Sequence, residues 1–151
     1  MTTADKTPGC VLCRVRDGED EAERLLVHMA KLNFIVMNLY PYTSGHVMIA
    51  PRRHVGTLAS ATSEELSEMM SLARRLEEAM RSAYQPDALN LGMNLGRSAG
   101  AGVPDHIHLH VVPRWTGDTS FMTVVSKTRV IPEEPGEAAA RLRPFFEGMS
   151  S

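Results

Sequence analysis

Residues 105–115 contain three of the chain's six histidines at alternate positions, His106, His108 and His110. Alternation with a period of two is typical of a β-strand whose two faces differ in character. The imidazoles would share one face, with about 6.5–7 Å between successive side chains. The aliphatic residues among them would point into the core: Ile107, Leu109 and Val111. A face of this kind can do chemistry, because imidazole binds metals and acts as a nucleophile near neutral pH.

Two chemical interpretations fit this strand. Its imidazoles could converge on one metal ion, or one imidazole could attack a substrate with the other two as helpers. The alternative without chemistry is an exposed strand that is rich in histidine by chance. A glycine-rich loop, residues 94–104, runs directly into the histidines. Glycines let backbone N–H groups approach a ligand closely and form anion-binding concavities, so the loop favours a nucleophile that acts on a phosphate.

The pattern His-x-His-x-His followed by two apolar residues resembles the signature of the histidine triad (HIT) superfamily of nucleotide hydrolases and transferases. The resemblance extends over residues 38–55 and 94–122 and covers about residues 8–130. The continuation at residues 113–121 is most similar to the bacterial branch that includes diadenosine tetraphosphate phosphorylases.

The resemblance assigns the catalytic roles. The family's nucleophile is the central histidine, which corresponds to His108, expected to face a solvent-accessible cleft. His110 is expected to contact the transferring α-phosphate as a hydrogen-bond donor and electrostatic partner. A covalent nucleotidyl–His108 intermediate would then pass to water or to inorganic phosphate. The resemblance requires no catalytic metal on the phosphate, and no organic cofactor is expected.

Further residues are expected to contact the nucleotide substrate. Asn38 matches the family's ribose contact, and Asn94 matches the side chain that reaches the phosphate or the leaving group. The complete expected set is Asn38, His46, Asn94, Gly100, Ala101 and Gly102. Trp115 is either a core or interface aromatic or a residue that stacks on a base.

Cys10 and Cys13 form a C-x-x-C pair, which supplies half of a tetrahedral zinc site. His54 and His106 are the candidates for the other half. This set resembles a subset of HIT proteins, and the related galactose-1-phosphate uridylyltransferases, that bind a structural zinc. The alternatives are a free cysteine pair or a redox pair, and the redox interpretation lacks the βαβ context that it requires.

Length and composition favour one domain, residues 1–151, with its core at about 8–130 and a C-terminal extension at 131–151. Hydrophobic residues make up 43% of the chain, and the net charge is −2. That charge gives no strong attraction to a nucleic-acid polymer or to a membrane. The polar N-terminus and the absence of an apolar run of about 20 residues argue against a signal peptide and a membrane span. Two cysteines without an export signal favour the cytoplasm.

The elements that must position these residues can be read from the same patterns. A hairpin is predicted from strands at 25–29 and 34–37, with further strands at 46–50 and 88–94 and a short one at 121–125. Thr62 and Glu65 form a capping box that begins a helix ending near Tyr84. Residues 136–149 look helical but contain Pro144. The long helix should bury one apolar stripe: Leu66, Met69, Met70, Ala73, Leu76 and Met80.

These elements predict an α+β fold with an antiparallel sheet of about five strands and one long helix. The resemblance implies that two such sheets join in a homodimer. The function favoured is cleavage of dinucleoside polyphosphates at the α-phosphate, by hydrolysis or phosphorolysis. The alternatives are hydrolysis of a purine nucleoside phosphoramidate or an acyl-nucleotide, and a zinc-binding interaction module without turnover.

Overall fold

The computed structural model describes residues 9–19, 24–38, 44–100, 105–118 and 133–148. Five strands form one antiparallel sheet in the order β1-β2-β3-β5-β4. The strands are β1 (Leu26–Met29), β2 (Asn33–Met37), β3 (Val47–Pro51), β4 (Ala88–Met93) and β5 (Leu109–Arg114). The α+β architecture and the five-stranded antiparallel sheet are therefore confirmed. In the described residues, no helix combines the length and the apolar character needed to cross a membrane.

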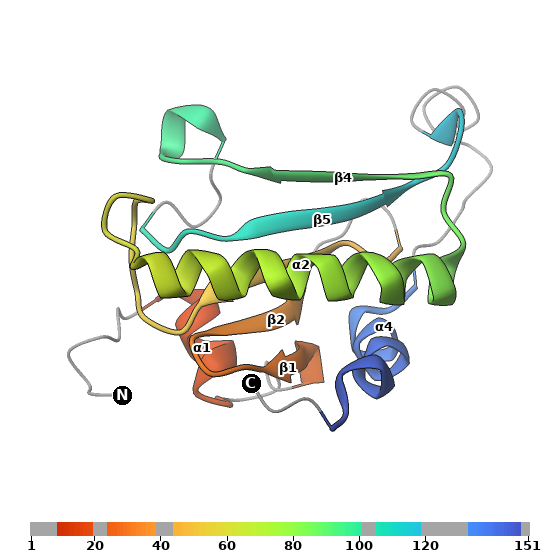
Figure 1. Ribbon diagram of the computed structural model, residues 1–151, viewed down its shortest axis with the longest axis horizontal. Helices are drawn as coiled ribbons and strands as arrows, with labels where there is room; N and C mark the ends of the chain where they lie inside the picture. Colours follow the sequence, from red (N-terminus) through yellow and green to blue (C-terminus); the bar gives the residue numbers. More distant parts are fainter. Residues whose placement is uncertain (1–8, 20–23, 39–43, 101–104, 119–132, 149–151) are drawn as a thin grey trace.

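The long helix α2 (Ser63–Tyr84) lies across the sheet (Figure 1). It begins at the predicted capping box, in which Glu65 N donates to Thr62 Oγ1 at 3.0 Å and Thr62 N donates to Glu65 Oε1 at 2.8 Å. It ends at Gln85, whose left-handed conformation, with φ of 49°, directs the chain out of the helix before Pro86. Both predicted ends of this helix are confirmed.

The apolar stripe of α2 differs in part from the prediction. Its buried apolar residues are Met69, Leu72, Ala73, Leu76, Ala79 and Met80. Met70 was predicted to be buried but is 60% exposed. It follows Met69 by one position, which turns its side chain by about 100° around the helix axis and away from the sheet.

The centre of the sheet forms the core. Every residue of β2 and of β3 is buried. The helix α2 contacts both strands, and a C-terminal helix, α4 (Pro135–Leu142), contacts β1, β2 and α2. A 3₁₀ turn, η4 (Arg143–Phe146), follows α4 and contains Pro144 near its start. The predicted interruption at Pro144 is confirmed, and the predicted strand at 121–125 lies outside the described residues.

An N-terminal helix, α1 (Val11–Arg16), was not predicted from the sequence. Cys10 is its N-cap, and the Cys10 sulfur accepts a hydrogen bond from Cys13 N at 3.4 Å. The two cysteines therefore lie one helical turn apart and point the same way. Sequence patterns missed the helix because it is six residues long, below the length at which periodicity is informative.

The predicted histidine strand is shorter than the alternation suggested. Pairing between β3 and β5 extends from Val47 opposite Val111 to Ile49 opposite Leu109, so that β5 begins only at Leu109. Pro51 on β3 has no N–H to donate to a longer ladder, and its carbonyl oxygen lies 2.8 Å from His106 Nε2. Of the three histidines, only the last therefore belongs to the strand proper.

Candidate functional site

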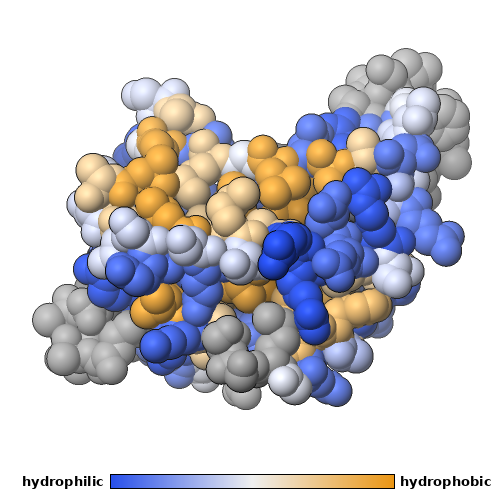
Figure 2. Space-filling model, in the orientation of Figure 1, coloured by the Kyte–Doolittle hydropathy of each residue, from blue (hydrophilic) through white to orange (hydrophobic). Residues whose placement is uncertain are grey.

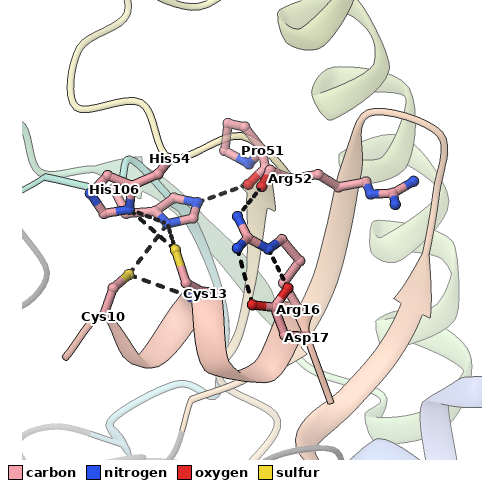
Figure 3. Close-up of polar contacts among 8 residues, drawn as sticks. All are labelled: Cys10, Cys13, Arg16, Asp17, Pro51, Arg52, His54 and His106. Atoms are coloured by element: carbon pink, nitrogen blue, oxygen red, sulfur yellow. Dashed lines mark hydrogen bonds and ion pairs between the residues drawn. The ribbon is translucent and has the colours of Figure 1, made fainter. Parts of the chain in front are cut away.

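Four side chains from three parts of the chain form a cysteine–histidine cluster: Cys10, Cys13, His54 and His106. Their ligand atoms all lie within 4.8 Å of one another. Figure 3 shows the two sulfurs of the α1 segment facing the rings of His54 and His106. His54 follows the end of β3, and His106 precedes β5, so the cluster ties the N-terminal segment to two neighbouring strands of the sheet.

The spacing of these atoms fits one tetrahedral metal ion. Zn–S bonds of about 2.3 Å and Zn–N bonds of about 2.0–2.1 Å place sulfur and nitrogen about 3.5 Å apart and two nitrogens about 3.3 Å apart. The Nδ1 atom of His106 lies 3.4 Å from Cys10 Sγ, 3.6 Å from Cys13 Sγ and 3.2 Å from His54 Nδ1. The Cys13 sulfur lies 3.3 Å from His54 Nδ1. The cluster can therefore hold a metal ion.

His106 is oriented for ligation by its second nitrogen. A carbonyl oxygen can only accept a hydrogen bond, so His106 Nε2–H donates to Pro51 O at 2.8 Å. Burial lowers the pKa of His106 to about 4, which keeps the ring neutral and leaves the lone pair on Nδ1. That lone pair faces the two sulfurs. A metal-binding histidine commonly has its other nitrogen bound to a carbonyl in this way.

Arg16 supports the cluster and was missed in the sequence. It is buried on α1, and its Nη1 donates to Arg52 O at 2.6 Å while Nε donates to Asp17 Oδ1 at 2.9 Å (Figure 3). Its position three residues after Cys13 places it on the same side of a helix as that cysteine. That signal could have been read only if the helix had been recognised. The guanidinium links α1 to the strand end that precedes His54.

A second group of side chains, the imidazole group, consists of His46, His108 and His110. The rings of His108 and His110 lie 4.8 Å apart at 74°, and those of His46 and His110 lie 5.0 Å apart. His108 Nδ1 lies 2.9 Å from His106 O, so Nδ1–H is the donor and the lone pair of the neutral ring is on Nε2. The ring is held by the backbone of a residue of the cysteine–histidine cluster. His108 is only 4% exposed, so the expected open cleft at this residue is not observed.

Asn38 fixes the tautomers of two histidines. Its amide nitrogen lies 3.1 Å from His46 Nδ1 and can only donate, so His46 carries its proton on Nε2. His46 Nε2 lies 2.8 Å from His110 Nδ1, which must accept. His110 therefore carries its own proton on Nε2. The β3–β5 register places His46 diagonally across from His110, which explains why residues 64 positions apart meet.

Burial keeps both of these histidines neutral. It lowers the pKa of His46 to about 4, with further contributions from His110 and His108. Burial also lowers the pKa of His110, and His108 adds to this effect. Near neutral pH the pair therefore presents an uncharged, oriented N–H donor at His110 Nε2. The expected role of His110 as a donor to the α-phosphate stays a prediction.

The remaining predicted nucleotide contacts are described in part. Asn94 directly follows Met93, which pairs with Leu109, so it lies at the histidine end of β4. Gly100 ends the 3₁₀ turn η3 (Arg97–Ala99) with φ of 94°, a conformation that a side chain disfavours. Ala101 and Gly102 lie outside the described residues. Trp115 is half-buried, and its backbone N–H donates to Asp118 Oδ2 at 3.1 Å.

The chain resembles proteins of one family in both sequence and structure. A family model described as the HIT domain matches residues 19–117. The chain is 41% identical over 113 residues to an AP-4-A phosphorylase of Mycobacterium tuberculosis, which covers 75% of this chain and 58% of that protein. It is 33% identical over 93 residues to the asymmetrical bis(5'-nucleosyl)-tetraphosphatase of Schizosaccharomyces pombe. That match covers 62% of this chain and 50% of the tetraphosphatase.

A solved structure agrees with the sequence relatives. A zinc-bound histidine triad family protein from Mycobacterium smegmatis matches with a TM-score of 0.72 and 27% identity, covering 91% of this chain and 92% of that one. The chain therefore belongs to the HIT family. It spans little more than half the length of the phosphorylase and half the length of the tetraphosphatase.

The neutral state of His46 predicts a pH-dependent stability. Its pKa is 6.5 in an unperturbed chain and about 4 in the folded protein, so between these values the unfolded chain binds the proton and the folded chain does not. The free energy of unfolding should therefore fall as the pH is lowered from 6.5 to 4, with His46 contributing on the order of 1–3 kcal/mol. Urea denaturation of the wild type and of His46→Gln across this range should show a shallower decline in the variant. Parallel curves would contradict the assignment.

Proposed function

We propose that this protein cleaves dinucleoside polyphosphates, such as diadenosine tetraphosphate, at the α-phosphate through a covalent bond to His108. The observation that carries the proposal is the arrangement of two nitrogens. His108 Nδ1–H is bound to His106 O, which leaves the Nε2 lone pair available, and the adjacent His110 carries its proton on Nε2. The names of the M. tuberculosis and S. pombe relatives describe enzymes of this substrate class.

In the first step, His108 Nε2 attacks the α-phosphorus and the bond to the bridging oxygen breaks. The leaving nucleoside polyphosphate takes the electron pair of that bond. His110 Nε2–H donates to a non-bridging oxygen, where the negative charge increases in the transition state. His106 O stabilises the positive charge that develops on the His108 ring, through the Nδ1–H bond of 2.9 Å. Because these groups are already oriented, little reorganisation is needed at the moment of reaction.

In the second step, water or inorganic phosphate attacks the same phosphorus and releases His108. Water gives a nucleoside monophosphate, and phosphate gives a nucleoside diphosphate. Asn94 and the backbone of residues 100–102 are the proposed contacts for the phosphate chain, and Asn38 is the proposed contact for the ribose. Gly100 has a positive φ, a conformation that glycine adopts without strain.

Product analysis tests this function. Diadenosine tetraphosphate should give ATP and ADP with phosphate present, or ATP and AMP without it. His108→Ala should lower the rate on the order of 10⁴-fold or more, because the nucleophile is lost. His28→Ala is a matched control, since the His28 ring stacks on Phe146 at 5.3 Å and belongs neither to the cysteine–histidine cluster nor to the imidazole group.

Three results would overturn the assignment. A His108→Ala variant that kept a tenth of the wild-type rate would exclude the covalent mechanism. Release of product from adenosine phosphoramidate, but not from the tetraphosphate, would favour the phosphoramidate alternative. No turnover of either substrate would favour a zinc-binding module.

We propose that the metal held by the cysteine–histidine cluster is a structural zinc. Two thiolates and two imidazoles form a closed tetrahedral set, which leaves no position for a substrate. The zinc would neutralise the two thiolates and fix the position of His106, whose carbonyl oxygen holds His108. The zinc-bound M. smegmatis protein of the same fold supports this choice of metal.

Removing the two thiolates should abolish zinc binding. Elemental analysis of wild-type protein purified without added metal should give about one zinc per chain, and the double variant Cys10→Ser, Cys13→Ser should give none. The melting temperature should fall with it, because the binding energy of a structural metal is folding energy. Arg14→Ser, at an exposed position on the same helix, should keep the zinc content and the melting temperature of the wild type. A double variant with full zinc would instead place the ion on the triad histidines and replace the nucleophile with a metal-activated water.

We also propose that two chains associate through β4. This strand is at the edge of the sheet, and edge strands offer unpaired backbone groups to a partner. Leu91 on β4 is 46% exposed and Leu95 after it is 44% exposed. Figure 2 shows apolar surface over β4, above α2. Such a surface at a sheet edge suits a second copy of the chain.

The contacts of α4 with β1, β2 and α2 support a single domain that extends over residues 1–151 and includes the C-terminal extension. We propose the cytoplasm as its location, because a reducing compartment keeps Cys10 and Cys13 as thiols that can bind a metal.

A further inference from the structure

The C-terminal segment beyond the matched HIT region contains a half-buried acidic residue, Glu133, that contacts several elements. Its side chain is 14% exposed and accepts three hydrogen bonds. Tyr84 Oη donates to Oε1 at 2.6 Å, and Arg141 donates to Oε2 from Nε at 3.1 Å and from Nη2 at 2.7 Å. Arg141 also lies over the Tyr84 ring, 5.1 Å from its centre. Glu133 therefore joins the last turn of α2 to α4, which lies below that end of α2 in Figure 1.

The same residue contacts the turn that precedes His46. Glu133 N–H donates to Ser44 Oγ at 2.9 Å. The next residue, Gly45, is buried and has φ of 81°; a Cβ at this position would lie 3.1 Å from Pro113 Cγ and 3.3 Å from Tyr84 Cε2. The backbone of Gly45 is thus packed directly between β5 and the Tyr84 ring. The Tyr84 ring and the Glu133 backbone therefore restrict the movement of residues 44 and 45.

The next residue after this turn is His46, whose ring holds His110 in its donor tautomer. We propose that Glu133 is a positioning residue that clamps the 44–45 turn, so that His46 stays in hydrogen-bond contact with His110. This inference rests on the proposed function, in which His110 donates to the α-phosphate. The residue acts through three contacts that come from different elements: the Tyr84 hydroxyl, the Arg141 guanidinium and the Ser44 hydroxyl.

The clamp has a catalytic consequence because the contact that it protects is short and directional. His46 Nε2 lies 2.8 Å from His110 Nδ1, and displacement of about 1 Å weakens a hydrogen bond steeply. Without the hydrogen bond from His46, the His110 ring can rotate and carry its proton on either nitrogen. Its Nε2–H is then no longer directed at the α-phosphate oxygen. Small misplacements of this kind cost about 10–100-fold in rate. Affinity for the nucleotide depends on other groups and should change little.

The test compares Glu133→Ala with Glu133→Gln, which retains an acceptor for Tyr84 but loses the charge that pairs with Arg141. Ser44→Ala removes only the hydrogen bond from Glu133 N and serves if Glu133→Ala does not fold. Arg143→Ala is the matched control. This variant also removes contacts of the C-terminal segment, namely the hydrogen bonds of 2.8 Å from Arg143 to Leu26 O and Arg24 O. These bonds lie on the β1 side and away from the 44–45 turn.

Two readouts separate positioning from stability. Nitrogen-15 NMR of the histidine side chains in the substrate-free protein reports the tautomers of His46 and His110 directly. In Glu133→Ala these signals should move toward a mixture of tautomers, kcat should fall about 10-fold or more, and KM should change less than about twofold. Glu133→Gln should lie between this variant and the wild type. Arg143→Ala should lower the melting temperature yet leave the NMR signals and kcat unchanged.

Unchanged histidine signals in both Glu133→Ala and Ser44→Ala would overturn the proposal. So would an equal loss of kcat in Arg143→Ala, because that result would assign the effect to general loosening of the segment. The NMR measurement needs no turnover. A failure of the wild-type protein to cleave dinucleoside polyphosphates would therefore reject the proposed function and leave the tautomer comparison to decide whether the clamp exists.

Discussion

One imidazole connects the two halves of this site. The Nδ1 atom of His106 faces the sulfurs of Cys10 and Cys13, its Nε2–H donates to Pro51 O, and its carbonyl oxygen accepts from His108. The ring is fully buried. Any group that fixes the cysteine–histidine cluster therefore also fixes the backbone that aims His108. The same bond to Pro51 explains why β5 starts only at Leu109 and leaves the first two histidines outside the ladder.

Local patterns in the sequence were enough to predict most of the elements. The hairpin of β1 and β2, the capping box of α2 and the strand β4 all depend on residues close together in the chain, whose preferences act locally. The C-x-x-C spacing supplied Cys10 and Cys13, with His54 and His106 as candidates for the other half of the site in agreement with the HIT resemblance, and the structure brings all four together. The helix α1 was missed because one turn and a half of helix has no readable period.

Features that depend on distant contacts could not be predicted. The burial of His108 follows from packing that no local pattern encodes. The chain of hydrogen bonds from Asn38 through His46 to His110 depends on the register of β3 with β5, which joins residues 64 positions apart. The contact of Glu133 with Ser44 spans 89 positions and begins in a segment that the sequence identified only as an extension. Met70 shows a smaller error: the sequence placed both Met69 and Met70 in the buried stripe, and only Met69 faces the sheet.

The central claim is that His108 forms a covalent bond to the nucleotide, and mass spectrometry of the intact protein tests it most directly. Protein mixed with diadenosine tetraphosphate and quenched within the first turnover should contain chains heavier by one nucleoside monophosphate group. Peptide fragmentation should place that group on His108, and longer incubation with phosphate should remove it. Product formation in a single turnover without any modified chain, or with the group on another residue, would contradict the mechanism.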